Sequence, residues 1–318
     1  MCAIMGFSKK TYTKEELLPF FDRTRSRGPD MSQILETPSG WLCFHRLAIM
    51  GLTEAGMQPL SWTGTMCLQR RDLRLPLPEA AADGKRLLLP QRQRLRAPAA
   101  HVPGVRAGHV CPAGRGVRLI LYDGEADEYV AARDPIGIRP LFYGCDPDGG
   151  ILFASEAKQL VGLCEQILPF PPGHYWYRGR FVRYANPARP GLSRSDDMDT
   201  VCQNIHDKLI AAVDKRLDAD APLGFLLSGG LDSSLVCAIA ARLLGKLSHL
   251  RYRHGHRRHR SEVRSEGSAV HRGGPHGGDH HPGRRDSRSA KVVAALGTWD
   301  ITTIRASVGM YCAARPSA

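Results

Sequence analysis

The nine cysteines of this 318-residue chain include no C-x-x-C pair, so their spacing gives no support to a zinc ribbon or a disulfide framework. No apolar run approaches the ~20 residues of a membrane-spanning helix, and Lys9 and Lys10 follow the N-terminus too soon for a secretory leader. We therefore expect reduced cysteines, no membrane partner and a cytoplasmic protein. Apolar residues make up 42% and charged residues 24% of the chain, which is ordinary for a soluble globular protein of about two domains.

Aromatic residues are absent from two long segments, Leu68–Arg118 and Arg253–Thr298, and the positive charge gathers in the same places. Leu68–Arg118 holds ten Arg and one Lys against three acidic residues, and Arg251–Arg288 holds ten Arg against four. The whole chain has a formal charge of +13, so the rest of it is close to neutral. Segments of this composition cannot build a hydrophobic core, and we expect both to be disordered.

These basic segments favour neither a nucleic-acid nor a metal partner. A surface that binds single-stranded nucleic acid needs aromatic side chains for stacking beside its basic groups, and both segments lack them. Eight histidines stand between His249 and His281, but no fixed ligand spacing recurs among them. A nucleic-acid-binding protein is therefore the less favoured class of function, and a steep salt dependence of retention on DNA or RNA would support it.

The N-terminus carries a residue with nucleophilic chemistry. Cys2 directly follows Met1, and a small second residue generally allows the initiator Met to be removed. Cys2 would then hold a thiol together with a free α-amine, a group whose ordinary pKa of ~7.7–8.0 lets it act as a base near neutral pH. Since the thiolate is the attacking form, Cys2 is the candidate catalytic residue.

Six short motifs occur in order from the N-terminus. They are M-C-x-I at 1–4, R-G-P-D at 27–30, H-R-L-A-I at 45–49, G-x-Q-P at 56–59, A-R-D-P-x-G-I-R-P-L at 132–141 and A-S-E-x-K at 154–158. This series resembles the class II glutamine amidotransferase domain over roughly residues 2–60 and 119–185. The resemblance implies an N-terminal-nucleophile αββα sandwich, in which two antiparallel sheets are stacked between helices.

The same resemblance implies hydrolysis of glutamine to glutamate and ammonia, with Cys2 attacking the side-chain amide. Arg46 would hold the substrate carboxylate, a task that suits the planar fork of an arginine. The glutamine-binding residues so implied are Arg46, Leu47, Ala48, Ile49 and Met50. The family's N-G-E motif, which supplies oxyanion-hole donors, occurs nowhere in this sequence, and the first basic segment stands where that motif and a later substrate-binding Asp should fall.

A second region is typical of a strand, a glycine-rich loop and a helix. Ala221–Leu227 is apolar, Ser228–Ser234 has the sequence S-G-G-L-D-S-S, and Leu235–Gly245 is rich in helix formers with a glycine at its end. Such a loop surrounds a phosphate with backbone N–H groups and a helix N-terminus, and Asp232 can hold Mg²⁺. The candidate ATP-binding residues are Leu226, Ser228, Gly229, Gly230, Leu231, Asp232, Ser233 and Ser234.

This loop lacks the G-K-[ST] of a Walker A motif and instead resembles the pyrophosphatase-type loop of enzymes that cleave ATP between its α- and β-phosphates. A glutamine amidotransferase domain followed by such a loop resembles the glutamine-hydrolysing asparagine synthetase family. Residues 300–307 resemble that family's D-x-T-T-x-R-A-S motif, which implies that Thr302, Thr303 and Arg305 lie at an aspartate/adenylate site.

The resemblance to this family implies a ligase that uses ATP and Mg²⁺ to adenylate aspartate and displaces AMP with glutamine-derived ammonia. Its substrates would be glutamine, aspartate and ATP, and the sequence leaves open whether the chain forms a homodimer. Other amide-forming relatives, such as β-lactam synthetases, share both domains, but Cys2 favours a glutamine-using enzyme. Amidophosphoribosyltransferases share the first domain and lack the S-G-G-L-D-S-S loop.

The expected organisation is an amidotransferase domain at 2–185, a linker at 186–203 and a partial α/β parallel-sheet ATP pyrophosphatase-type domain at 204–318. Family-like sequence stops at the two basic segments, 68–118 and 251–297, and then resumes in register. We hypothesise that these segments are translated in a shifted frame or derive from a decayed gene, which resequencing would test. Because the family continues well beyond Arg305, we expect a truncated synthase domain that makes asparagine poorly.

Overall fold

The computed structural model describes residues 2–62, 65–69, 116–188, 196–227, 230–245, 249–250, 285–298 and 300–313. The chain divides into two compact units, Met1–Arg194 and Ser195–Ala318, and each is described by itself. The division falls inside the stretch 186–203 that we expected to be a linker. Within the described ranges, no helix combines the length and the apolar character needed to cross a membrane.

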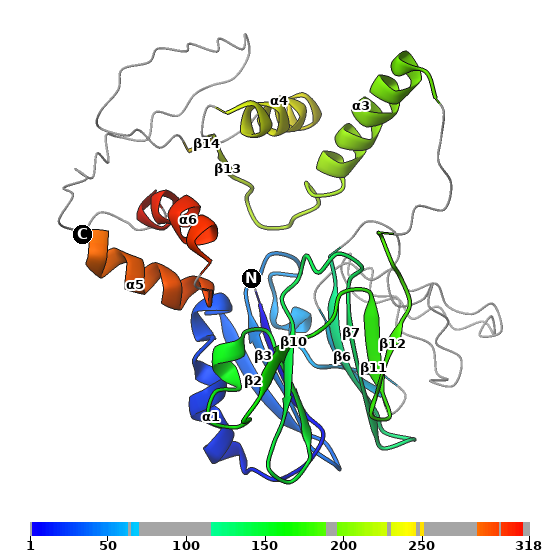
Figure 1. The fold of residues 1–318 in the computed structure, drawn as a ribbon, viewed down its shortest axis with the longest axis vertical. Coiled ribbons are helices and arrows are strands. Elements are labelled where there is room, and N and C mark those ends of the chain that lie inside the picture. Colours follow the sequence, from blue (N-terminus) through cyan, green and yellow to red (C-terminus); the bar gives the residue numbers. More distant parts are fainter. Residues whose placement is uncertain are drawn as a thin grey trace. The chain divides into compact units, whose positions relative to one another are not determined.

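The first unit consists of two six-stranded sheets in which all neighbouring strands are antiparallel (Figure 1). The first sheet has the order β10-β8-β9-β1-β3-β2, and the second has the order β12-β11-β7-β6-β5-β4. The strands are β1 Ala3–Phe7, β2 Met31–Glu36, β3 Trp41–Arg46, β4 Leu60–Trp62, β5 Thr65–Gln69, β6 Arg118–Asp123, β7 Glu128–Arg133, β8 Phe142–Cys145, β9 Ile151–Ala154, β10 Ile167–Pro169, β11 His174–Tyr177 and β12 Arg180–Arg183.

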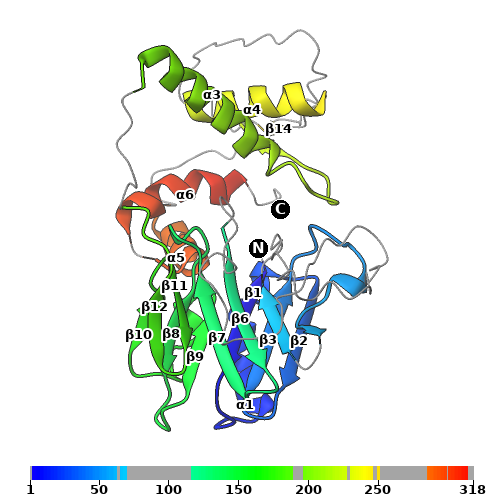
Figure 2. The ribbon, with the colours of Figure 1, turned by 90° about the vertical axis from the view of Figure 1, so that its right-hand side faces the viewer.

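The main core lies between the two sheets, which are stacked face to face with the second sheet toward the viewer in Figure 2. Alternate residues of the central strands point to opposite faces, so Ile4 of β1 and Ile120 of β6 belong to the core between the sheets while Met5 packs on the outer face of its sheet. Both faces of β1 are buried, which explains why its sequence is continuously apolar rather than alternating.

Helix α1, Lys14–Asp22, covers the outer face of the first sheet. Thr13 and Glu16 form a reciprocal capping box at its start, and Leu17 and Phe21, four residues apart, are the buried positions. In the described part of this unit no α-helix covers the outer face of the second sheet, where Tyr175, Tyr177 and Tyr184 pack against the strands. The predicted mixed α/β fold with stacked antiparallel sheets is thus confirmed, and among the described residues α1 covers the outer face of the first sheet.

The second unit contains four helices and a two-stranded parallel sheet among its described residues. The helices are α3 Met198–Asp214, α4 Leu231–Leu244, α5 Arg285–Leu296 and α6 Ile301–Ala313; the strands are β13 Phe225–Leu226 and β14 His249–Leu250. Helix α3 packs against α4, and α5 packs against α6. Gly245 ends α4 with a φ of 71°, as the sequence predicted for a glycine cap.

Three features differ from the sequence-based expectations. The strand expected over Ala221–Leu227 is limited to two residues, and Leu226 is 49% exposed, because β14 is its one partner among the described strands. Both ends of the first basic segment lie in strands: Leu68 is part of β5, and Arg118 is the first residue of β6. Helix α5 covers the end of the second basic segment, where residues 292–296 are apolar and Val292 is buried.

Candidate functional site

Cys2 lies at the start of β1, beside the segment that follows β3. Ala3 of β1 pairs with His45 of β3. The antiparallel register therefore brings Cys2 opposite Arg46 and close to Leu47. The Leu47 N–H donates to Cys2 Sγ at 3.3 Å, and the thiol lies 3.5 Å from the Leu47 carbonyl oxygen, to which it can donate in turn. The side chain is half-buried, so the sulfur is held by the main chain of the predicted glutamine-binding segment.

The R-G-P-D motif supports this segment from the other side. Gly28 packs so closely that a Cβ there would lie 2.6 Å from the Arg46 nitrogen, which leaves room for no other residue. The Asp30 N–H donates to the Arg46 carbonyl at 3.1 Å, and Asp30 Oδ2 accepts from the Ala48 N–H at 2.6 Å. The motif therefore fixes the chain on both sides of Leu47.

Arg46 is 2% exposed, and its guanidinium faces the loop that follows the glutamine-binding segment. It donates to the carbonyl oxygens of Thr53 at 2.6 Å and Met50 at 3.5 Å, and also to that of Gly51. Gly56 of the G-x-Q-P motif lies directly against the guanidinium. The N–H donors of Arg46, which the resemblance assigns to a substrate carboxylate, are thus bonded to neutral carbonyl oxygens. A carboxylate is a stronger acceptor than a carbonyl for these N–H groups.

His45 precedes Arg46 and is fully buried. Its ring stacks on Phe21 with centroids 3.6 Å apart, Nδ1 lies 2.7 Å from Ser32 Oγ, and Nε2 lies 3.0 Å from the Phe21 carbonyl oxygen. A neutral ring that donates from Nε2 and accepts at Nδ1 satisfies both contacts. Burial holds the pKa of His45 below its ordinary value, so this histidine supports the strand and is not a proton carrier at neutral pH.

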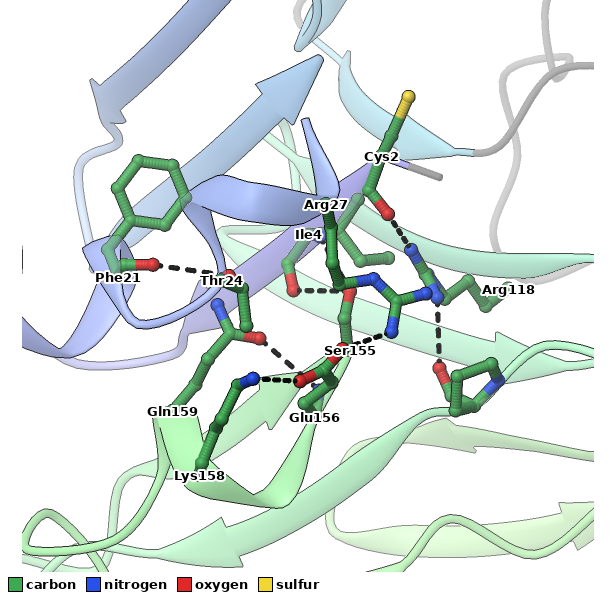
Figure 3. A network of polar contacts seen from close by, with 11 residues as sticks. Cys2, Ile4, Phe21, Thr24, Arg27, Arg118, Ser155, Glu156, Lys158 and Gln159 are labelled. Atoms are coloured by element: carbon green, nitrogen blue, oxygen red, sulfur yellow. Dashed lines mark hydrogen bonds and ion pairs between the residues drawn. The ribbon is translucent and has the colours of Figure 1, made fainter. Parts of the chain in front are cut away.

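The A-S-E-x-K motif meets β1 next to Cys2 (Figure 3). The Ile4 N–H donates to Ser155 Oγ at 2.7 Å, and Ser155 Oγ donates back to the Ile4 carbonyl at 3.1 Å. Glu156 is almost fully buried and forms ion pairs with Lys158, at 2.7 Å, and with Arg27. The motif therefore anchors the strand that carries the nucleophile to the R-G-P-D turn.

Arg118 is a residue that sequence reasoning missed, because it stands at the end of a segment that we expected to be disordered. Its side chain is 1% exposed and donates to the Cys2 carbonyl oxygen at 2.6 Å and to the Pro140 carbonyl oxygen at 3.1 Å. No sequence motif marks it. Only the arrangement of β6 across from β1 reveals the contact.

The A-R-D-P motif shapes a loop and does not carry reactive groups. Asp134 is 1% exposed and accepts from the N–H groups of Ile138 at 2.8 Å and Arg139 at 3.0 Å. Arg133 donates to the carbonyl oxygens of Arg139, Phe170 and Gly137. These contacts hold the loop whose Pro140 carbonyl meets Arg118.

The predicted phosphate loop of the second unit is partly described. Ser228 and Gly229 lie outside the described residues; Gly230 is the N-cap of α4, and Leu231, Asp232, Ser233 and Ser234 form its first turn. The Ser234 N–H donates to the Gly230 carbonyl at 3.1 Å, and Ser233 Oγ donates to the same carbonyl at 3.1 Å. Asp232 is exposed at the positive end of the helix dipole, where a phosphate is favoured.

The predicted aspartate/adenylate residues open α6. Asp300 caps the helix by accepting from the Thr303 N–H at 2.7 Å. The Thr303 hydroxyl, together with this N–H, lowers the pKa of Asp300. Thr302, Thr303 and Arg305 are exposed in the first turns of the helix. Because α6 packs on α5 while α4 packs on α3, these residues and Asp232 belong to separate helix pairs.

The described residues do not by themselves form a complete metal site. No cluster of three or more His, Cys, Asp or Glu side chains occurs among the described residues. Mg²⁺ is bound through one or two carboxylates together with substrate phosphates, and the exposed carboxylate of Asp232 fits that pattern. The His-rich tract between His249 and His281 is nearly all outside the described residues.

Comparisons with known proteins match both units. The glutamine amidotransferase domain model matches residues 1–68 and 114–169, and the asparagine synthase model matches residues 204–298, so together they cover well over half of the chain. A probable asparagine synthetase (glutamine-hydrolyzing) from Dictyostelium discoideum is 31% identical over 361 residues, covering 99% of this chain and 61% of its own length. The chain belongs to the asparagine synthetase family.

A second relative in the asparagine synthetase family matches the chain over a similar length. The probable asparagine synthetase of Schizosaccharomyces pombe is 33% identical over 348 residues, covering 95% of this chain and 58% of its own length. The chain thus spans about three fifths of the length of these two relatives. The break in the amidotransferase match, at 69–113, falls inside the first basic segment.

Among solved structures, the glutamine phosphoribosylpyrophosphate amidotransferase of B. subtilis aligns with a TM-score of 0.39 and 11% identity, covering 79% of this chain and 66% of that chain. Similarity at this level supports no conclusion. The fold assignment rests instead on the strand order and on the motifs of the asparagine synthetase family found in their expected places.

Proposed function

We propose that the first unit hydrolyses glutamine with Cys2 as the nucleophile and that the second unit uses the ammonia to convert aspartate to asparagine at the expense of ATP. The observation that carries the first half is the contact of Cys2 Sγ with the main chain of Leu47, the residue that follows the buried Arg46. A thiol held on a rigid strand, close in the chain to an arginine able to bind a carboxylate, supports the proposed glutamine hydrolysis.

In the proposed reaction, Cys2 Sγ attacks the amide carbon of glutamine and ammonia leaves, with the Cys2 α-amine accepting the thiol proton and returning it to the leaving group. Water then hydrolyses the thioester to release glutamate. Arg46 exchanges the carbonyl oxygens of Met50, Gly51 and Thr53 for the substrate carboxylate. The Leu47–Met50 segment provides the wall beside the substrate.

In the second unit, Gly230–Ser234 would surround the phosphates of ATP, together with Leu226, Ser228 and Gly229. Asp232 would hold Mg²⁺, which when bound would spread the negative charge of the departing pyrophosphate. Thr302, Thr303 and Arg305 would orient the aspartate carboxylate for adenylation. Support for this half comes from the loop sequence, from the start of α4 at Leu231 and from the asparagine synthase match over 204–298.

A direct test of the first half is glutamate release from glutamine by the wild-type chain and by Cys2→Ala. We expect Cys2→Ala to abolish hydrolysis and Cys145→Ser, which alters an exposed thiol, to leave it unchanged. Cys43 would be a poor control, because it is fully buried in the core. Hydrolysis that persists in Cys2→Ala would rule out this nucleophile.

The second half is tested by ATP binding and by aspartate-dependent release of pyrophosphate. We expect Asp232→Ala to weaken ATP binding about tenfold in Mg²⁺ and to have little effect in EDTA, since a single metal contact is lost. Asp207→Ala, which removes an exposed carboxylate from α3, is the matched control. Equal Mg²⁺-dependent affinity in wild type and Asp232→Ala would contradict the assignment.

A further inference from the structure

We propose that Arg118 is a positioning residue for the Cys2 nucleophile. The guanidinium of Arg118 donates to the carbonyl oxygen of Cys2 at 2.6 Å, while the sulfur of the same residue is held by Leu47. Figure 3 shows the Cys2 carbonyl turned toward Arg118 and the sulfur pointing away from the guanidinium. The inference rests on the proposed glutamine hydrolysis, in which Cys2 is the attacking group.

The strand pattern places Arg118 between the sheets. Ile120 and Tyr122 of β6 point into the core between the sheets, and Arg118 has the same parity, whereas Leu119 and Leu121 pack on the outer face. Gly6 of β1 lies directly over Ile120, where a Cβ would come within 2.9 Å of the isoleucine side chain. This close approach of β1 to β6 allows a side chain of β6 to reach the main chain of Cys2.

A second contact fixes the guanidinium itself. Arg118 also donates to the Pro140 carbonyl oxygen at 3.1 Å, in the loop that Asp134 and Arg133 hold together. The forked guanidinium therefore joins the nucleophile to a rigid loop, a geometry that the single ammonium of Lys reproduces only in part. With its side chain 1% exposed, Arg118 is shielded from competing water.

The consequence for the reaction is geometric. Leu47 fixes the sulfur of Cys2 and Arg118 fixes its carbonyl, so the intervening Cα–Cβ bond has a defined direction toward the substrate. Attack by a nucleophile depends steeply on this direction, and a displacement of about 1 Å can cost on the order of 10²-fold in rate. Arg46, which we assign to substrate binding, makes none of these contacts to Cys2 in the structure as described.

The experiment compares Arg118→Met, Arg118→Lys and the control Arg178→Met in the full chain. Arg178 is an arginine of the same unit that pairs with Glu128 at 3.2 Å, and the contacts described for it include neither Cys2 nor the loop of Pro140. For Arg118→Met we expect kcat for glutamine hydrolysis to fall on the order of 10²-fold while KM stays within about threefold. Arg118→Lys should recover part of the loss, and Arg178→Met should retain wild-type kcat.

A second readout does not depend on catalysis. The Leu47 N–H is protected by its bond to Cys2 Sγ, so its NMR-detected hydrogen exchange reports the position of Cys2. We expect this exchange to accelerate at least about tenfold in Arg118→Met, with core amides such as Phe44 unchanged. If wild type fails to hydrolyse glutamine, the proposed function fails, but the exchange measurement still tests the positioning role.

Three outcomes would overturn the proposal. One is unchanged kcat in a folded Arg118→Met, and another is Leu47 exchange equal to that of wild type. The third is equal acceleration at Leu47 and Phe44, which would mean that Arg118 supports the fold as a whole. If Arg118→Met does not fold, Arg118→Lys decides: a kcat and Leu47 exchange equal to wild type would then overturn the proposal, and intermediate values of both would support it.

Discussion

Asp30 Oδ2 accepts a hydrogen bond from the Ala48 N–H at 2.6 Å, across 18 residues of sequence. Asp30 belongs to the R-G-P-D motif and Ala48 to the H-R-L-A-I motif, so two motifs that are separate in sequence form one structural element. The bond fixes the chain one residue beyond Leu47, whose main chain contacts the Cys2 sulfur. Rigidity of this segment is therefore a precondition for the proposed glutaminase site.

The first prediction concerns this bond. Asp30→Ala should lower kcat/KM for glutamine hydrolysis about tenfold, since a hydrogen bond to a charged group contributes roughly 1.5–3 kcal/mol to holding the segment. Asp30→Asn keeps an acceptor oxygen and should retain most of the activity. Asp148→Ala, at an exposed turn of the same unit, is the control for general effects of removing a carboxylate. Equal activity in Asp30→Ala and Asp148→Ala would show that the bond has no role.

The second prediction concerns Gly56, which packs against the guanidinium of Arg46. In Gly56→Ala the new Cβ would also lie 2.7 Å from the Gly51 carbonyl oxygen, so either the loop or the arginine must move. We expect KM for glutamine to rise about tenfold with a smaller change in kcat, because substrate binding is perturbed more than the nucleophile. Gly224→Ala, at a position with open space around it, should change neither constant.

The third prediction is a pH dependence of stability that arises from His45. Burial lowers the pKa of His45 in the folded state, so below its ordinary value of 6.5 the unfolded chain binds the proton more readily. The free energy of unfolding should therefore be constant above that value and should fall as the pH is lowered below it, by up to about 1.4 kcal/mol per pH unit. The contacts of the ring include Ser32, Phe21 and the Asp22 carboxylate at 3.8 Å, with Arg25 opposing protonation.

Denaturant unfolding at pH 5 to 8, followed by tryptophan fluorescence, measures this dependence through Trp41 and Trp176, which are buried in the first unit. His45→Gln cannot take up the proton and should show a flatter profile than wild type. A profile that is equally steep in both proteins would assign the acid sensitivity to other groups.

The fourth prediction concerns the missing N-G-E motif. Removal of one oxyanion donor typically costs about 10²–10³ in rate, so the chain should hydrolyse glutamine slowly and make little asparagine. Replacing residues 70–115 with the corresponding segment of the Schizosaccharomyces pombe relative should raise glutaminase activity by about the same factor. A folded chimera no faster than the original chain would show that the basic segment does not limit the reaction.

How much the sequence could predict differs between the two units. In the first unit, the motifs around Cys2, Arg46 and Ser155 predicted an antiparallel sandwich, and the two sheets are found. In the second, the apolar run Ala221–Leu227 predicted a buried strand, but two residues form β13 and Leu226 is half exposed. A buried parallel strand needs neighbours on both edges, and its own residues cannot supply them.

Residue type and spacing along the chain were enough to predict the candidate nucleophile, the asparagine synthetase family and a strand, loop and helix around Ser228–Ser234. Which side chains meet depends on how the strands pack: Asp30 with Ala48, Arg118 with Cys2, and Arg46 with the carbonyls of its own loop. Arg118 stood in a stretch without period or aromatics, and nothing local distinguished it from nine other arginines there. Its role depends on the packing of β6 across from β1, a relation between strands more than a hundred residues apart.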